Sequence, residues 1–145
     1  MSQEIFEQHR GSLRISTDSK LIDVAAVHAF LRRSYWAADR TRAQLEQTIA
    51  ASRCFGLYDD EHQIGFARVV TDYAAFAWLC DVFIDEAYRG RELGTWLLET
   101  VLADPHLLSV RRWVLATRDA HGLYEKFGFE PLRAPERWME RRDAL

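Results

Sequence analysis

The sequence predicts one mixed α/β domain around a central, mostly antiparallel sheet of about six to seven strands flanked by about four helices. One reason is that the hydrophobic period changes along the chain, from helical spacing in the first third to alternating and apolar runs in the middle. Another is that short turns join three successive apolar runs, which favours antiparallel neighbours. A strand–helix–strand crossover follows them, so the sheet is expected to be mixed.

Two helices are expected in the first half, after a leader and one short strand. Residues 1–11 are polar and charged and are expected to be a loose leader, which leaves 12–145 as the single domain. Ser12–Ser16 alternates apolar and polar side chains, as strands do. The helices are predicted by apolar residues at helical spacing over 21–33 and by a T-x-x-Q capping box that starts at Thr41.

The second half is expected to hold five more strands and two more helices. The helices begin after Arg89-Gly90 and at His121, and the second of them ends before Gly128. The predicted strands are Cys54–Asp59, Gln63–Asp72, Ala77–Asp85, Trp113–Thr117 and a final Trp138–Arg141.

Composition excludes several classes of partner. The chain has 145 residues, 48% hydrophobic and 28% charged, which is ordinary for a globular domain. Its formal net charge of −3 gives no basic field, so a nucleic-acid partner is not expected. No apolar run approaches the roughly 18 residues of a membrane span, so no membrane partner is expected either.

The cysteines and histidines favour a cytoplasmic protein without a metal. Cys54 and Cys80 have no disulfide-framework spacing, and the N-terminal residues lack the apolar core of a signal peptide. None of the five histidines has a partner at metal-ligand spacing. A reducing cytoplasm is therefore the expected compartment, and no metal is expected.

The most informative segment runs from Asp81 to Trp96, where an apolar strand leads through a basic, glycine-containing turn into a helix. That arrangement directs free backbone N–H groups and the positive end of the helix dipole at one spot, which suits a pyrophosphate. A G-x-G-x-x-G or Walker motif is absent. The segment predicts an anion site, and a regulator that binds ATP or NAD there is one open alternative.

Two motifs resemble those of the GNAT superfamily of acetyl-CoA-dependent N-acetyltransferases. Arg89-Gly90-Arg91-Glu92-Leu93-Gly94 matches the family's Gln/Arg-x-x-Gly-x-Gly/Ala turn, and Leu123–Phe129 matches its Leu-Tyr…Gly-Phe motif downstream. Glu92 departs from the pattern because it stands where the family has a glycine. Thr117 also departs, since many members have asparagine in that strand.

The resemblance implies where acetyl-CoA binds. The backbone of Val82, Phe83 and Ile84 would pair with the pantetheine arm like an added strand, and Thr117 would donate a hydrogen bond. Lys126 and Arg118 are candidates for the outer phosphate, although ordinary surface charge is an equal alternative. The pyrophosphate would be held by the turn residues Arg89, Gly90, Arg91, Glu92, Leu93, Gly94 and Thr95.

Two residues are expected to take part in the chemistry. The family motif places Tyr124 at the leaving thiolate, where it would act first as a hydrogen-bond donor. Asp81 interrupts an apolar strand, so its carboxylate must be paired or have a raised pKa. A raised pKa would suit a general base, whereas pairing would make Asp81 an anchor for a neighbouring arginine or loop amide. Candidate residues of the acceptor pocket are Tyr35, Trp36, Asp72, Tyr73 and His121.

The sequence therefore predicts an N-acetyltransferase that moves acetyl from acetyl-CoA to a primary amine of a small molecule or peptide by direct attack. The alternative is a GNAT-fold acyl-CoA-binding sensor or interaction module without catalysis, which Glu92 keeps open. The resemblance also includes homodimers as one option.

Overall fold

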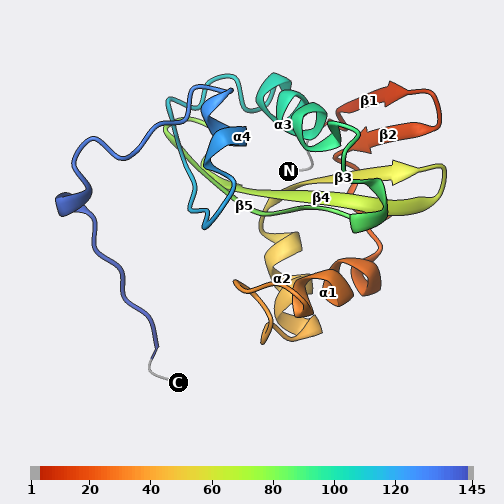
Figure 1. Cartoon of the computed structure of the whole chain (residues 1–145), viewed down its shortest axis with the longest axis horizontal. Coiled ribbons are helices and arrows are strands. Elements are labelled where there is room, and N and C mark those ends of the chain that lie inside the picture. Colours follow the sequence, from red (N-terminus) through yellow and green to blue (C-terminus); the bar gives the residue numbers. More distant parts are fainter. Residues whose placement is uncertain (1–3, 144–145) are drawn as a thin grey trace.

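A computed structural model describes residues 4–143 and contains one six-stranded sheet (Figure 1). The strands lie side by side in chain order, and every neighbouring pair is antiparallel except the parallel pair β5–β6. The strands are β1 Glu7–Arg10, β2 Leu13–Ser16, β3 Arg53–Asp59, β4 His62–Thr71, β5 Phe76–Ile84 and β6 Arg112–Val114.

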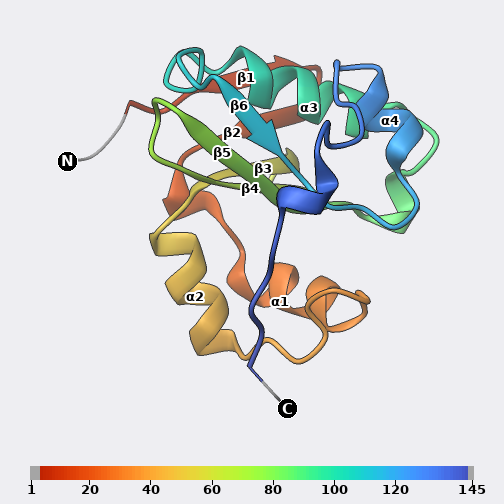
Figure 2. The ribbon, with the colours of Figure 1, turned by 90° about the vertical axis from the view of Figure 1, so that its left-hand side faces the viewer.

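Helices cover both faces of the sheet, so the molecule has three layers (Figures 1 and 2). One face carries α1 and α2, and the other carries α3 and α4. Their bounds are α1 Val24–Arg32, α2 Arg42–Ala50, α3 Leu93–Ala103 and α4 His121–Glu125. Within residues 4–143, no helix has the length and apolar character needed to span a bilayer.

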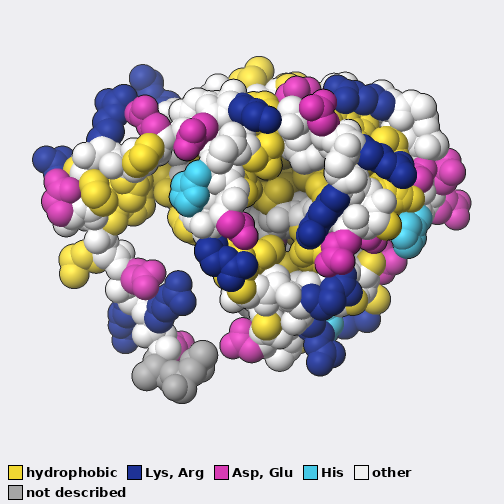
Figure 3. Space-filling view, viewed as in Figure 1, with side chains coloured by type: hydrophobic (Ala, Val, Ile, Leu, Met, Phe, Trp, Pro, Cys, Tyr) yellow, Lys and Arg dark blue, Asp and Glu magenta, His cyan; other side chains and the backbone are white. Residues whose placement is uncertain are grey.

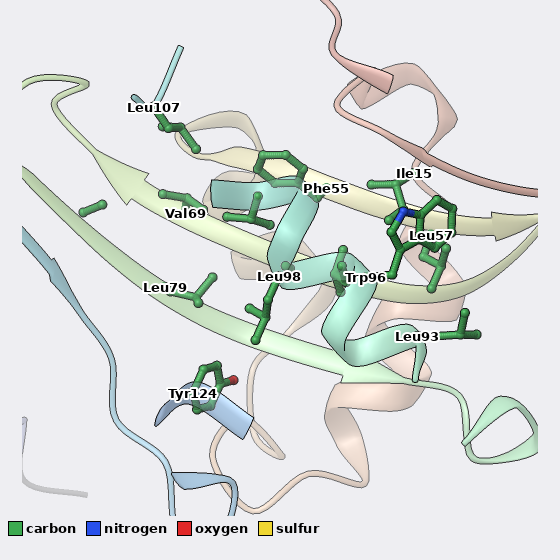
Figure 4. Packing of buried hydrophobic residues seen from close by; sticks show 14 of the residues in the cluster. Ile15, Phe55, Leu57, Val69, Leu79, Leu93, Trp96, Leu98, Leu107 and Tyr124 are labelled. Atoms are coloured by element: carbon green, nitrogen blue, oxygen red, sulfur yellow. The ribbon is translucent and has the colours of Figure 1, made fainter. Parts of the chain in front are cut away.

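Two hydrophobic cores hold these layers together. The larger lies between the sheet and α3, where Phe55, Leu79 and Trp96 pack with the side chain of Tyr124 (Figure 4). The smaller lies under α1 and α2 and includes Phe83 of β5. Since β5 contributes side chains to both cores, it is packed on both of its faces. The candidate site described below lies along this strand.

The predicted fold class is confirmed, and so are the four helices and the strands β2 to β5, to within a few residues at their ends. The capping box of α2 is present as expected, with the Thr41 side chain accepting from the Gln44 amide and the Gln44 side chain accepting from the Thr41 amide. Helix α1 begins at Val24, later than the apolar pattern that starts at residue 21, because Asp23 caps it by accepting a hydrogen bond from the Ala26 amide.

The two ends of the chain differ from the prediction. Residues 7–10 of the expected loose leader form β1, which pairs with β2, while residues 1–3 of that leader lie outside the described residues. The expected final strand Trp138–Arg141 is wrong, since this stretch is extended and pairs with no described strand. The C-terminal segment that follows α4 extends away from the packed domain and passes in front of the edge of the sheet (Figures 1 and 2).

A β-bulge in β5 changes the backbone geometry next to the candidate site described below. Phe66 of β4 pairs with Phe83, but Arg68 pairs with Cys80, so β5 has one extra residue between them. Asp81 takes up that extra length with φ 52°, a left-handed conformation uncommon for residues other than glycine. Bulges bend and twist a strand. Consistent with this, the pairing of β5 with β6 ends before the bulge, at Trp78↔Val114.

Candidate active site

The strands β5 and β6 diverge beyond Trp78, and a groove of about 950 Å³ opens between them. Its walls come from α1, the α1–α2 loop, β5, the start of α3, and the β6–α4 segment. Figure 3 shows this face as a hollow between the two helical layers, with a hydrophobic floor and several Lys or Arg side chains around its rim.

One wall of the groove is a free sheet edge. Residues 79–84 of β5 are in a strand that pairs with β4 on one side and has no described strand on the other. The backbone of Val82, Phe83 and Ile84 lies in this stretch, and all three residues line the groove. Unpaired strand edges accept an extended ligand by backbone hydrogen bonds.

The start of α3 meets the end of that edge. Gly94 lies in the first turn of α3, and it lines the groove together with Arg89. No side chain caps the helix, so its first amides keep their hydrogen-bonding capacity and the positive end of the helix dipole. A free sheet edge leading to an uncapped helix N-terminus suits an elongated ligand with an anionic group.

The turn before α3 depends on two left-handed residues. Gly90 has φ 84° and Glu92 has φ 59°, and only Gly90 adopts this conformation without steric cost. Glu92 is exposed. Arg91 places its guanidinium over the Tyr88 ring at 4.9 Å. Leu93 instead packs in the core, and Thr95 is half-buried.

Tyr124 lies on the opposite wall of the groove. Its ring is buried at 8% exposure against Phe129, while the side chain still contributes to the groove lining. Burial, and secondarily the nearby Tyr35, raises the pKa of Tyr124 to about 12, so its hydroxyl is a proton-bearing donor at neutral pH. Thr117 also lines the groove, and its hydroxyl oxygen accepts from the Ala120 amide at the start of α4.

Asp81 is paired, which matches the anchoring alternative of the two that the sequence left open. Its carboxylate accepts from Trp36 Nε1 at 2.9 Å, Arg40 Nη1 at 2.6 Å and Arg68 Nε at 2.8 Å. Burial alone would raise the pKa of Asp81, but the hydrogen bonds and charges of the two arginines outweigh it, so the pKa lies below its usual value. A carboxylate held in this way is an anchor and a poor proton acceptor.

The partners of Asp81 were missed by the sequence reasoning. Arg68 interrupts the apolar run of β4 much as Asp81 interrupts that of β5, and adjacent antiparallel strands bring such opposite charges together. That pair of interruptions was a usable signal. Arg40 had no comparable signal, because it lies in a loop and reaches β5 only through the tertiary fold.

Tyr35 and Trp36 line the groove as expected. Their rings meet edge to face at 5.0 Å, and the Trp36 indole is tied to Asp81. The Tyr35 hydroxyl accepts from the backbone N–H of Arg118 at 3.0 Å, and the Arg118 guanidinium lies 3.9 Å from the centre of the Tyr35 ring. These contacts join the α1–α2 loop to the β6–α4 segment across the groove.

Nine predicted residues do not line the groove, namely the four described next and, around the start of α3, Gly90, Arg91, Glu92, Leu93 and Thr95. Asp72 caps the turn before β5, where its Oδ1 accepts from the amides of residues 74–76, and these bonds lower its pKa. Tyr73 packs beside the larger core. His121 faces a separate groove next to the C-terminal tail, and Lys126 is exposed after α4.

The groove offers no evident nucleophile or metal site among the described residues. Cys80 lines it, but burial raises the pKa of this thiol to about 11, which keeps it protonated at neutral pH. Residues 4–143 contain no group of three or more His, Cys, Asp or Glu side chains suited to a metal ion.

Comparisons with known proteins agree with this geometry. Residues 50–131 match the profile of the acetyltransferase (GNAT) domain. A protein of Gibberella zeae assigned to the acetyltransferases is 32% identical over 141 residues, covering 81% of this chain and 78% of that protein.

Solved structures give the same result. A Xanthomonas campestris structure assigned to the GNAT family is 43% identical, with a TM-score of 0.87 over 90% of this chain and 93% of that one. A Clostridium acetobutylicum structure described as a predicted acetyltransferase with acetyl-CoA shares the fold at 14% identity, with a TM-score of 0.67 over 90% of this chain and 94% of that one.

Proposed function

Since the chain belongs to the GNAT acetyltransferase family, we propose that it transfers acetyl from acetyl-CoA to a primary amine of a small molecule or peptide by direct attack. The observation that carries the proposal is the continuous groove in which the free edge of β5 leads to the uncapped start of α3. That groove matches an extended arm that ends in a pyrophosphate.

The residues present fit acetyl-CoA. The backbone of 82–84 would pair with its pantetheine arm, and the amides of the 89–95 turn would hold its pyrophosphate, with Arg89 adding charge. Acetyl-CoA supplies an activated acetyl thioester, and the acetyl-CoA-containing relative from Clostridium acetobutylicum, which has the same fold, supports this choice.

The chain's own groups serve three purposes in the transfer. A backbone amide near Phe83 would donate to the thioester carbonyl oxygen, where negative charge would develop. Tyr124 would donate a hydrogen bond to the departing CoA sulfur as the C–S bond breaks and the new C–N bond forms, and the proton lost by the amine would pass to solvent water. Asp81 orients Trp36 and Arg40 and remains ionised, so it is a positioning residue and not the base.

The proposal is tested first by binding and then by turnover. We expect acetyl-CoA and CoA to raise the melting temperature, and ATP and NAD to leave it unchanged. A panel of amino acids, polyamines, aminoglycosides and peptide N-termini should then give amine-dependent CoA release. Stabilisation by ATP or NAD alone would contradict the proposal, and acetyl-CoA binding without release for any amine would favour the non-catalytic sensor.

Gly94→Ala should weaken acetyl-CoA binding while stabilising the fold. A methyl group at Gly94 meets only Leu123 Cδ2, at an ordinary 3.7 Å, so the helix accepts it and gains about 0.5–1 kcal/mol of stability. The same methyl group blocks close approach of a phosphate to the first turn of α3. Calorimetry should show an affinity loss of roughly 10-fold, equivalent to one weakened charge-assisted hydrogen bond.

Gly122→Ala is the matched control. Gly122 also lies in a helix, and its added methyl group would meet nothing within 4 Å. This variant should be as stable as Gly94→Ala and keep the acetyl-CoA affinity of the parent protein. Equal affinities for the two variants would remove the start of α3 from the binding site.

Glu92→Gly should strengthen acetyl-CoA binding and the fold together. Glycine takes the left-handed conformation without the steric cost of about 1 kcal/mol that Glu92 bears. It also removes a carboxylate from beside the phosphate turn, which should improve affinity by about twofold to tenfold at low salt. Calorimetry and denaturation measure the two effects.

Glu92→Gln separates those effects, because it removes the charge and keeps the backbone conformation. We expect its acetyl-CoA affinity to rise and its stability to stay at the parental value. The affinity gains should shrink in 0.5 M salt, where a Debye length of about 4 Å screens exposed charges. Gains that ignore salt would contradict the electrostatic explanation.

A further inference from the structure

The charges around the groove bear on the acceptor, which the family resemblance leaves open. Six arginines and three acidic residues contribute to the groove walls, although the whole chain has a formal net charge of −3. The local charge is therefore opposite in sign to the overall charge. What matters for an incoming amine is which of these charges face the ligand.

Two of the three acids in the groove are already paired with arginines. The Asp81 side chain is only 1% exposed and is already shared by two guanidinium groups. Asp119 lies 3.6 Å from the Arg118 guanidinium. Glu86 belongs to the short helix Glu86–Tyr88, between β5 and α3 along the chain, and is exposed. A polycationic acceptor would therefore meet six arginines and only one carboxylate, that of Glu86, without an ion pair among the described residues.

The arginines at this end keep unused capacity. Arg40 and Arg68 share the single carboxylate of Asp81, which leaves one net positive charge in that cluster. Only Nη1 of Arg40 donates to Asp81, and its Nη2 and Nε have no protein acceptor among the described residues. Arg33 is exposed and has no acidic partner within residues 4–143.

Arg33 and Arg40 are held toward the same part of β5. The Arg33 guanidinium lies 5.4 Å from the centre of the Phe30 ring, which stacks on Phe83 at 3.8 Å. Arg40 is tied to Asp81 at 2.6 Å. Asp81 and Phe83 are two residues apart on β5, about 7 Å along a strand. Both arginines line the groove, and each is held near residues 81–83 of β5, Arg40 directly and Arg33 through Phe30, next to the strand that would present the thioester.

We infer that the acceptor carries an oxyanion group, a carboxylate or a phosphate, in addition to its amine, and that Arg33 together with Arg40 binds this group. The inference rests on the proposed function and specifies its substrate class. Guanidinium groups bind carboxylates and phosphates through paired N–H donors, so they select an anionic group by geometry as well as charge. The preferred acceptors are amino acids or amine phosphates, and polyamines are disfavoured.

Matched pairs of amines test the inference. L-phenylalanine with phenethylamine, and O-phosphoethanolamine with ethanolamine, differ only in the anionic group and separate carboxylate from phosphate, and spermidine represents the polycations. Binding to the CoA-loaded protein is measured by calorimetry and kcat/KM by CoA release. We expect at least one anionic member to exceed its neutral partner and spermidine by about 10-fold or more in both measurements.

Variants of two adjacent arginines locate the effect. Arg33→Ala should remove most of that preference, Arg33→Lys should retain part of it, and the acetyl-CoA affinity should not change. Arg32→Ala is the control, because Arg32, the last residue of α1, is also exposed but does not line the groove. Arg32→Ala should keep the full preference.

The outcomes distinguish this inference from the proposed function. Equal binding of charged and neutral partners, preference for spermidine, no binding by any probe, or equal behaviour of the Arg33→Ala and Arg32→Ala variants would overturn the inference. CoA release from neutral amines alone would leave the transferase intact and still overturn it. Binding of anionic amines that depends on Arg33 but gives no CoA release would instead contradict the transferase function.

Discussion

Asp81→Asn is expected to lower the free energy of unfolding by about 3 kcal/mol, the usual cost of removing one partner from a buried ion pair. The Asp81 carboxylate is 1% exposed, and the Arg68 side chain that it pairs with is 11% exposed. The amide keeps the shape of the side chain but cannot neutralise the guanidinium groups of Arg68 and Arg40. Denaturant unfolding of the parent and the variant measures the difference.

The pH dependence of stability should change in the same variant. Because the folded-state pKa of Asp81 lies below its usual value of about 4, its contribution is present above pH 4 and is lost as the pH falls through the folded pKa. The parent should therefore lose stability below pH 4 more steeply than Asp81→Asn. Parallel curves for the two proteins would contradict the ion-pair explanation.

Two further variants make the assignment specific. Asp119→Asn removes an exposed acid from the same groove, and we expect it to change stability by less than about 0.5 kcal/mol. Combining Asp81→Asn with Arg68→Met removes the uncompensated charge, so the double variant should recover part of the loss. A double variant that is less stable than the sum of both changes would indicate a different role for the cluster.

Tyr124→Phe is expected to lower kcat by about 10- to 100-fold while leaving acetyl-CoA affinity nearly unchanged. The magnitude corresponds to one hydrogen bond made to a developing charge. With a pKa of about 12 for Tyr124, full proton transfer to a thiolate whose conjugate acid has a pKa of about 8.5 is uphill by about 5 kcal/mol. Tyr124 therefore stabilises the leaving sulfur as a donor, and water or buffer delivers the proton.

This mechanism also has a signature in the pH–rate profile. Tyr124 remains protonated well above neutral pH, so the parent and the variant should show the same profile shape between pH 7 and 10, displaced by a constant factor. Tyr73→Phe is the control, since Tyr73 is partly buried and lies outside the groove. Equal activity of Tyr124→Phe and Tyr73→Phe would remove Tyr124 from the reaction.

The sequence predicted a strand correctly where its local residue pattern matches the environment that the tertiary fold gives it. Strands β3 to β5 are apolar, and the fold buries them under helices, so their pattern identified them. β1 was missed because Glu7–Arg10 is entirely polar, and it is a strand only because β2 offers it an edge. Trp138–Arg141 is the converse case: it has a strand-like pattern, but no described strand lies beside it to pair with.

The same distinction between local pattern and tertiary contact applies to the residues of the candidate site. The turn between β5 and α3 is a local sequence motif, so the residues around Arg89 and Gly94 were identified from the sequence. The bulge at Asp81 depends on the register between β4 and β5, and register is not readable from one strand. The pairing of Asp81 with Arg40 joins residues 41 positions apart, which no local pattern reports.

The free edge of β5 also affects how the protein behaves without a ligand. An unpaired edge is a template for intermolecular strand pairing, and natural sheets usually protect such edges with lysine, proline or a covering segment. The stretch of β5 with the unpaired edge, Leu79–Ile84, contains neither lysine nor proline, and its charged residue is buried in an ion-pair cluster. Protection of this edge against aggregation therefore depends on the depth of the groove and on the molecule bound in it. Ligand-free preparations should therefore precipitate first on heating or concentration, and CoA should serve as a solubilising additive.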